Sequence, residues 1–331
     1  MSVGGCYVLA GSSSWADRSL VREGTFYPSR SLGAAQRLGF YASRLPLTEV
    51  ATTYRFPPTP EVAKRWAAST PPGFTMDIRA WSLLSGAPTW PESLWPDLQR
   101  HIKPSRREST KLYRHRLPAE VVDECWDRFH HSLRPLAEAG RLGAVLVRFP
   151  SWFRPRSAAW EELAALPGRL EGYRVAVELT SHHWFDGDAC EHTLALLEGL
   201  GLGFVCQDTP GSQRPVVAAT SDLAFVRFPG RSPHTWDGSS VAAVLPAGRE
   251  PVGGDEEPEG EETGEPLGTS TAPEPVAWWS YRYSEAELAE WVPAVRDLAS
   301  CTSEVHLIMD NCWRADAVDN ASTLLDLVAR S

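Results

Sequence analysis

The sequence of 331 residues lacks the patterns that mark membrane and secreted proteins. No apolar run approaches the roughly 18 residues that a membrane span needs, so no membrane association is expected. The first residues carry neither the basic segment nor the long apolar core of a signal peptide, and a cytoplasmic protein is the expectation. None of the six cysteines forms a CxxC pair, which predicts reduced, mostly buried thiols rather than a disulfide framework.

Signatures of several enzyme classes are also missing. The serines of GSSSW (11–15) form no GxSxG nucleophile elbow and lack the glycines of a phosphate-binding loop; they are better explained as turn residues that cap backbone groups. Neither HxH nor HExxH occurs, and the adjacent His182 and His183 would point to opposite faces of an extended segment. The sequence therefore predicts no metal site and no cofactor.

What the chain does contain is enough apolar material for a large core. Hydrophobic residues make up 43% of the sequence, and there are 14 tryptophans. The net charge of −10 is unevenly spread, because residues 246–276 hold nine acidic residues and one arginine, a net of −8. The remaining chain is close to neutral, so its overall charge argues neither for nor against a polyanionic partner.

Short β-type runs alternate with helix-type segments along the chain. This order favours a (β/α)8 TIM barrel that forms one domain over residues 1–331, and a doubly wound sheet is the alternative. The connection 209–222 is short for a helix. The expected strands are 5–12, 47–54, 74–81, 143–150, 174–180, 203–208, 223–230 and 303–311, and the expected helices lie near 31–44, 60–66, 118–140, 157–166, 188–200, 283–300 and 315–329.

Two long loops depart from this pattern. Residues 100–116 hold seven Lys or Arg and a single Glu, and a basic loop of this kind could contact nucleic-acid phosphates. Residues 246–275 are rich in Gly, Pro and Glu, which predicts a disordered acidic insertion. The insertion could bind a protein partner without any catalysis. In a TIM barrel both loops would emerge at the C-terminal ends of the strands, where active sites lie.

Charged residues recur near the predicted C-terminal ends of the strands. A buried charge without a partner is costly, so such a ring must be mutually paired or must face a polar cleft. Three interpretations stay open: an acid–base pair of Glu49 and Glu178, an anion clamp of arginines, or a purely structural network. The charged residues are Glu49, Asp77, Arg79, Arg148, Glu178, Asp208, Arg227, Arg231 and Asp310.

Several segments resemble, in order, the YecE-like family, also called domain of unknown function 72. GSSSW (11–15) followed by FYP (26–28) resembles that family's GTSGW and FYP, and TEVATTY (48–54) resembles VEINSTFY. Further matches are EVAKRWAASTPPGFTMDIRA (61–80), AVELTSHHW (176–184), DTP (208–210), FVRFPGR (225–231), YRYSEAEL (281–288) and the DN pairs between 310 and 322. The resemblance covers the chain outside the two long loops, and it implies a TIM barrel without a particular activity.

Departures from the family pattern make the expected barrel mouth richer in arginine. Glu49 and Glu178 are kept, but Ala51, Thr180, Ser181 and Pro229 replace polar or basic residues, Arg79 replaces a lysine, Arg148 a glutamine and Asp310 an asparagine. The leading hypothesis is a mouth that binds a small anionic or polyhydroxylated ligand, with Glu49 and Glu178 as a metal-independent acid–base pair. The expected ligand-binding residues are Trp15, Arg79, Arg148, Asp208, Arg227, Arg231, Tyr281, Asp310 and Asn311.

Overall fold

The computed structural model describes residues 1–102, 111–208, 215–232 and 280–331. The central part of the basic loop 100–116 and the whole acidic insertion 246–275 therefore lie outside the described residues. Leu112, in the C-terminal part of the basic loop, forms an antiparallel bridge with Thr89, which ties this part of the loop to the segment before η2 (Pro91–Ser93).

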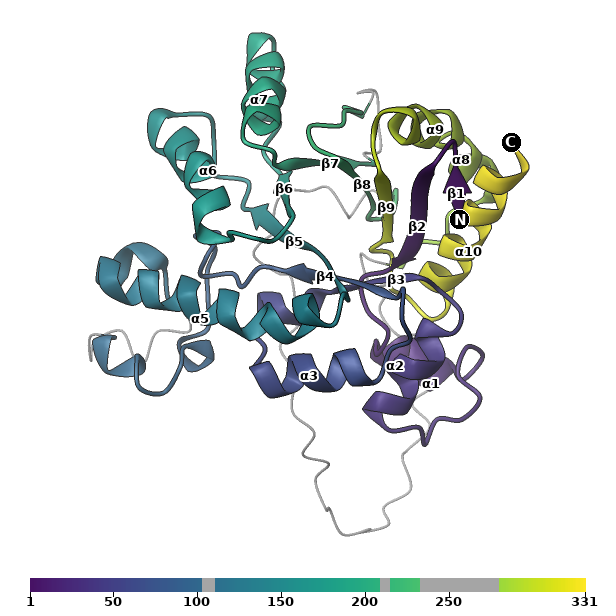
Figure 1. Ribbon diagram of the computed structural model, residues 1–331, viewed down its shortest axis with the longest axis horizontal. Coiled ribbons are helices and arrows are strands. Elements are labelled where there is room, and N and C mark those ends of the chain that lie inside the picture. The colour runs from purple at the N-terminus through teal and green to yellow at the C-terminus, as the bar shows by residue number, and fades with distance from the viewer. Residues whose placement is uncertain (103–110, 209–214, 233–279) are drawn as a thin grey trace.

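A closed barrel of eight parallel strands forms the centre of the molecule (Figure 1). The strands pair in chain order, and the first of them, β2, pairs with the last, β9, which closes the barrel. A short antiparallel strand, β1 (Ser2–Val3), pairs with β2. The TIM barrel expected from the sequence is confirmed, since closure excludes a doubly wound sheet. The barrel strands are β2 (Cys6–Ser12), β3 (Leu47–Val50), β4 (Thr75–Arg79), β5 (Leu142–Phe149), β6 (Val175–Leu179), β7 (Gly203–Gln207), β8 (Leu223–Phe228) and β9 (Glu304–Met309).

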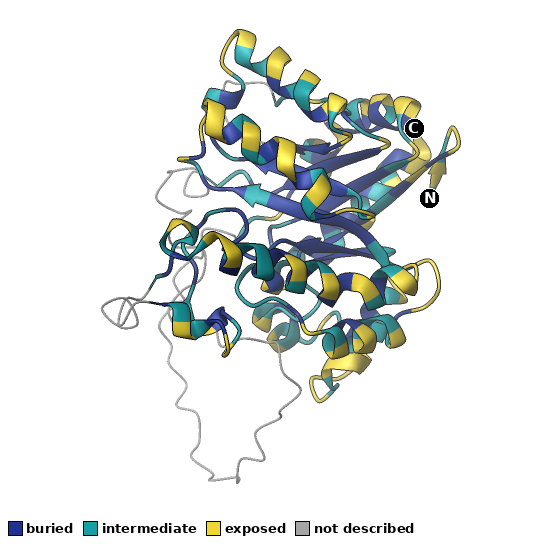
Figure 2. Ribbon diagram, turned by 60° about the vertical axis from the view of Figure 1, so that its left-hand side comes forward, coloured by how far each residue is buried: buried dark blue, intermediate teal, exposed yellow. Residues whose placement is uncertain are grey.

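Helices surround the barrel and turn their exposed faces to solvent, while most residues of the barrel strands are buried (Figure 2). Within the described residues, none of the helices has the length and apolar character needed to cross a membrane. The α-helices are α1 (Arg18–Glu23), α2 (Ala34–Ala42), α3 (Pro60–Ala68), α5 (Ala119–Glu138), α6 (Ser157–Arg169), α7 (Asp188–Gly199), α8 (Glu285–Ala289), α9 (Val292–Cys301) and α10 (Asp316–Arg330), and the 3₁₀ helices are η1 (Ala51–Tyr54), η2 (Pro91–Ser93), η3 (Gln99–His101), η4 (Arg114–Arg116) and η5 (His182–Trp184).

Some predicted elements are shorter or divided. The strand expected over 47–54 ends at Val50, because Thr53 donates hydrogen bonds to the carbonyls of Val50 and Arg79 and fixes a 3₁₀ turn. The single helix expected over 283–300 is two helices, α8 and α9. Pro293 lies in the first turn of α9, where its missing N–H costs nothing, whereas it would disrupt a continuous helix. The capping box predicted at Ser284 and Glu287 is present.

Inside the barrel, an apolar layer fills the middle. It is formed by buried side chains from six strands, with Leu9 of β2 packed against them. Side chains alternate between the two faces of a strand, so the residue two positions later points inward again, nearer the C-terminal end. This layer therefore forms the floor beneath whatever side chains follow it. Its residues are Leu47, Leu146, Ala176, Val205, Phe225 and Ile308.

The contact between β2 and β3 depends on Gly11. A Cβ atom on Gly11 would lie 1.8 Å from the carbonyl oxygen of Leu47, so only glycine allows the two strands to approach. Tyr41 of α2 fixes the same junction: its hydroxyl donates to the Leu47 carbonyl at 3.0 Å and accepts from the Ser12 N–H at 2.8 Å. This arrangement holds the C-terminal end of β2, and with it Ser13, beside the barrel mouth.

Candidate functional site

A layer of charged side chains lies above the apolar floor, at the C-terminal ends of the strands. Each member follows an inward-facing residue by two positions: Glu49 follows Leu47, Arg148 follows Leu146, and Arg227 follows Phe225. Because side chains alternate in direction along each strand, all of these charged side chains point into the barrel interior. We call the set the charged layer; it consists of Glu49, Arg79, Arg148, Glu178, Arg227 and Asp310.

Arg227 is the centre of the charged layer. Its guanidinium is hydrogen-bonded to Glu49, lies 3.0 Å from Glu178 Oε2, and places Nη1 3.2 Å from Asp310 Oδ2. Arg79 donates from Nε to Glu49 Oε1 at 2.5 Å, and its Nη2 lies 3.6 Å from Asp310 Oδ2. Arg148 lies on the other side, with Nε 3.3 Å from Glu178 Oε1. The three guanidinium groups and three carboxylates balance in formal charge.

Mutual pairing keeps these buried groups charged. Burial disfavours the ionised form of Asp310, but Arg227, Arg79 and Arg148 outweigh that cost and hold its pKa at about 2. Burial likewise opposes the charge of Arg227, yet Glu178, Glu49 and Asp310 raise its pKa above the ordinary arginine value. Ser13 adds a hydrogen bond from its hydroxyl to Asp310 Oδ1 at 2.5 Å.

Three buried polar atoms of the charged layer lack a hydrogen-bond partner among the described residues: Arg79 Nη2, Arg227 Nη1 and Glu178 Oε1. Their nearest opposite charges stand at the ion-pair distances given above. Buried polar groups in folded proteins are nearly always hydrogen-bonded, so orphan atoms of this kind are a common mark of a site for water, an ion or a ligand.

Solvent reaches the charged layer through two of its members. The side chains of Arg148 and Asp310 are 25% and 21% exposed, whereas those of Glu49, Glu178 and Arg227 are almost completely buried. Tyr54, at the end of η1, is within electrostatic reach: burial raises the pKa of its phenol, and the positive charges of Arg148 and Arg79 oppose that rise. Neither Tyr54 nor Ser13 was expected at this site from the sequence, although both closely follow a strand that ends at the mouth.

Asp208, Arg231 and Tyr281 belong to a separate cluster. Arg231 donates two hydrogen bonds of 2.9 Å to the two oxygens of Asp208, which also accept from the Tyr283 hydroxyl at 2.7 Å and Trp291 Nε1 at 2.8 Å. Tyr281 donates to Glu287 of α8. These contacts join the ends of β7 and β8 to α8 and α9, and they leave the Asp208 carboxylate fully occupied.

Two further predicted ligand-binding residues make other contacts. Asn311 donates from Nδ2 to the Tyr281 carbonyl at 2.7 Å and to Asn320 Oδ1 at 2.9 Å, so it links β9 to α10. The Trp15 ring packs edge-on against Trp66 at a centroid distance of 6.0 Å, and its carbonyl accepts a hydrogen bond from Tyr27. The structure brings six predicted residues together in the charged layer and places the others around it or beyond it.

A second buried network lies at the opposite end of the barrel. His306 of β9 is fully buried between Asp77 Oδ2, 2.8 Å from Nδ1, and Glu304 Oε1, 3.0 Å from Nε2. Burial alone would lower the histidine pKa, but Asp77 and Glu304 raise it to about 9, so the imidazole is a cation at neutral pH. Asp77, expected from the sequence at the mouth, thus points to the lower network, while Arg79 on the same face joins the charged layer.

Two other features lie apart from the charged layer. A surface cavity of about 480 Å³ lies between α3 and α5 and is lined by residues such as Trp95, Arg128 and His131. Among the described residues, one group of side chains could surround a metal ion: His182, His183 and Asp186, whose ligand atoms lie within 4.8 Å of one another. Neither feature shares a residue with the charged layer.

Comparisons with known proteins agree on the fold and on the family resemblance. The family profile described as "Protein of unknown function DUF72" matches residues 9–331. The UPF0759 protein YunF of Bacillus subtilis (strain 168) is 23% identical over 327 residues, which cover 97% of this chain and 94% of that protein. A DUF72 family crystal structure from Enterococcus faecalis V583 superposes with a TM-score of 0.66 at 20% identity, over 98% of this chain and 96% of that one. A DUF72 family crystal structure from Thermotoga maritima MSB8 superposes with a TM-score of 0.66 at 21% identity, over 98% of this chain and 99% of that one.

Proposed function

Since the chain belongs to the DUF72 family, whose description states no activity, we propose a function from its own residues: the charged layer binds a small polyhydroxylated ligand that carries an anionic group. The observation that carries this proposal is the set of three buried atoms without hydrogen bonds. Arg79 Nη2 and Arg227 Nη1 would donate to the anionic group, and Glu178 Oε1 would accept from a hydroxyl.

The charge balance of the layer supports this class of ligand. Because its arginines and carboxylates are equal in number, the mouth has no surplus of positive charge to hold a polyanion. A ligand with one anionic group and several hydroxyls matches both the guanidinium donors and the carboxylate acceptors. Arg148 and Asp310, the members that solvent reaches, would meet it first.

The same contacts support a division of roles between the two glutamates. Both oxygens of Glu49 accept hydrogen bonds from arginines, so Glu49 would position Arg79 and Arg227. Glu178 uses Oε2 for Arg227, while its Oε1, an ion-pair partner of Arg148, accepts no hydrogen bond and would accept one from a ligand hydroxyl. If the bound ligand is turned over, Glu178 is therefore the proton acceptor, and no metal ion is needed for that step.

The two alternative functions stay hypotheses with less support. Nucleic-acid binding depends on the basic loop 100–116, and binding of a protein partner depends on the acidic insertion 246–275. The centre of the first segment and all of the second lie outside the described residues. A cytoplasmic location is part of the proposal and follows from the sequence argument alone.

Ligand screening with a matched pair of arginine variants tests the proposal. Inorganic phosphate, small hydroxy acids and sugar phosphates are assayed by thermal shift, and each compound that raises Tm is titrated by calorimetry. We expect Arg148→Gln to weaken binding by about 10–100-fold, because it removes the solvent-reached positive charge that would meet the anionic group first. Arg134→Gln, on the exposed face of α5, is the control and should bind like the wild type. Equal affinity in Arg148→Gln would place the ligand elsewhere.

A further inference from the structure

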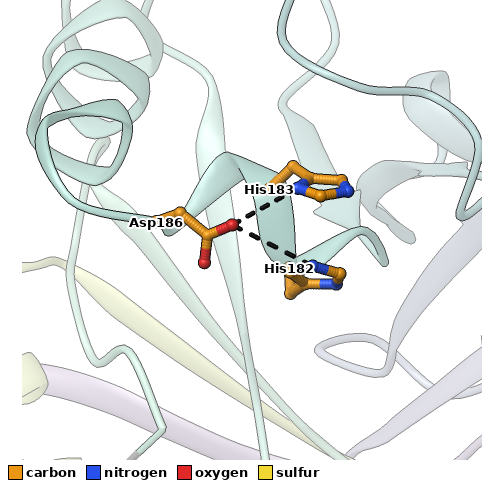
Figure 3. A group of neighbouring side chains, drawn as sticks. All are labelled: His182, His183 and Asp186. Carbon is orange, nitrogen blue, oxygen red and sulfur yellow. Dashed lines mark hydrogen bonds and ion pairs between the residues drawn. The ribbon is translucent and has the colours of Figure 1, made fainter.

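The turn that follows β6 carries three side chains that commonly bind metal ions. Residues 182–184 form the 3₁₀ helix η5 and not the extended segment that was expected from the sequence. The two histidines are therefore not forced to point to opposite faces. In the tighter turn, the rings of His182 and His183 lie on the same side, with centroids 4.0 Å apart (Figure 3).

Asp186 turns its carboxylate toward both rings (Figure 3). One oxygen, Oδ2, lies 3.3 Å from His183 Nδ1 and 3.9 Å from His182 Nε2. The next residue, Gly187, has φ of +52°, a conformation that side-chain-bearing residues rarely adopt. This glycine lets the chain reverse into α7 immediately after Asp186, which places the carboxylate back over η5.

The buried neighbour Trp184 holds the turn in place. Its ring is fully buried, Nε1 donates to the Phe153 carbonyl at 2.6 Å, and its own carbonyl accepts from Thr193 Oγ1 at 3.0 Å. The backbone that carries the two histidines is therefore anchored to the connection between β5 and α6 and to α7. An anchored backbone lowers the entropy cost of bringing the ligands together around an ion.

An ordinary surface ion pair does not explain why the side chains of His182, His183 and Asp186 point toward one another. The three side chains are 70%, 36% and 58% exposed, and a solvated histidine–carboxylate pair contributes little stability. Two imidazoles and one carboxylate form a donor set typical of zinc sites that keep a position open. Calcium and magnesium prefer oxygen ligands throughout.

We propose that His182, His183 and Asp186 bind a divalent transition-metal ion of the zinc type, with the remaining position open to water or a ligand. Tetrahedral zinc with bonds of about 2.0 Å needs donor atoms about 3.3 Å apart. The donors are within 4.8 Å of one another, so rotation of exposed side chains is sufficient to close the site. The proposal uses no residue of the charged layer and stands or falls independently of it.

Zinc titration of the full, untagged chain tests this site. Zn²⁺ is titrated in competition with a chromophoric chelator, with a phosphine reductant in place of thiols. The variants are the double substitution His182→Asn/His183→Asn and the single substitution Asp186→Asn. His115→Asn, an exposed histidine in η4, is the control. Because the substituted side chains are exposed or half-buried, all variants should unfold near the wild-type temperature, which circular dichroism checks.

We expect the wild type and the control to bind one Zn²⁺ alike and the double variant to bind at least about 10–100-fold more weakly, the usual loss when even a supporting residue is removed. Zinc should also raise the Tm of the wild type and of the control but not that of the double variant. Equal zinc affinity in the wild type and the double variant would overturn the proposal and move the ion to other groups, such as the cysteines. Absence of wild-type binding up to millimolar zinc would reduce the cluster to a surface ion pair.

Discussion

Arg227 shows how a single side chain can hold the mouth of the barrel together. It contacts Asp310 at the end of the neighbouring strand β9 and also Glu49 of β3 and Glu178 of β6, two strands that do not pair with its own strand β8. Buried ion pairs give up hydration to form, and their net contribution to stability is small. Removing one partner of a buried ion pair lowers stability strongly, because the remaining buried charge is left without an opposite charge.

We therefore expect Arg227→Met to lower the free energy of unfolding by about 3–5 kcal/mol, measured by urea denaturation at pH 7. The methionine fills much of the space but leaves Glu49 and Glu178 without their shared cation. Arg134→Met, which removes an exposed pair with Glu138, should change stability little. Similar losses in both variants would contradict the structural role of Arg227.

His306 makes stability depend on pH. Its pKa is about 9 in the folded protein and 6.5 ordinarily, so folding favours the protonated ring. The resulting stabilisation is complete below about pH 6.5 and is lost as pH rises through 9. We expect the free energy of unfolding to fall by about 2 kcal/mol between pH 6.5 and 8.5, measured by urea denaturation.

His306→Gln is the matched variant for this measurement, and its stability should vary much less over the same range. The interval ends at pH 8.5 because Cys125 and Cys206, whose pKa values burial raises from 9.0 to about 12, add their own pH dependence above it. If the free energy of unfolding of His306→Gln falls with pH as steeply as that of the wild type, groups other than His306 cause the pH dependence.

At the scale of elements, Gly143 allows the start of β5 to lie close to β4. A Cβ atom on Gly143 would lie 2.4 Å from Asp77 Oδ1 and 2.5 Å from Thr75 Cγ2. The buried Asp77–His306 pair therefore needs a strand without a side chain at this position. Asp77 also accepts a hydrogen bond from the Ala144 N–H at 2.8 Å, which ties β4 to β5 just above Gly143.

Gly143→Ala should accordingly destabilise the protein by about 1–3 kcal/mol, the usual cost of overpacking a core, as a lower Tm in a thermal melt. Gly168→Ala in α6 is the control, since nothing lies within 4 Å of its Cβ position and alanine is the better helix former. That variant should be unchanged or slightly more stable. A neutral Gly143→Ala would show that β4 and β5 can separate freely.

The sequence predicted the elements well where their ends carry strong local signals and poorly where tertiary contacts end them. Short Val/Leu-rich runs located the barrel strands because buried parallel strands are apolar on both faces. The sequence after Val50 predicts a strand because ATTY contains β-favouring residues, whereas in the structure the hydrogen bonds of Thr53 to the carbonyls of Val50 and Arg79 fix η1 instead. Helix α1 was missed because its six residues give almost no periodicity.

For the site, alternation along the strands explains both what was predicted and what was not. Charges near the C-terminal ends of parallel strands had to gather at one end of the barrel. Asp208, however, follows Gln207, which is in register with the inward-facing Arg227, so Asp208 points away from the interior. The pairing of particular charges depends on barrel closure, and adjacent positions in the sequence contain no information about it.

At the scale of the whole molecule, residues 1–331 are expected to fold as one domain. β2 and β9, from the two ends of the chain, complete a single barrel. We expect unfolding in urea to give the same midpoint by tryptophan fluorescence and by far-UV circular dichroism, as for one cooperative unit. Two separate transitions would contradict the single-domain prediction. All six cysteines are free thiols in the structure; Cys6, Cys125 and Cys206 are buried and Cys301 is exposed.

The burial of Arg227 has a consequence for experiments at different ionic strengths. Dissolved ions screen exposed charges over about 10 Å at 0.1 M salt but act much less on charges that water does not reach. Binding of a small ligand at Arg227 should thus persist from 50 to 500 mM sodium chloride. Attachment of a nucleic acid through the basic loop 100–116 would weaken by orders of magnitude over a similar range. A salt series alone therefore separates the two functions.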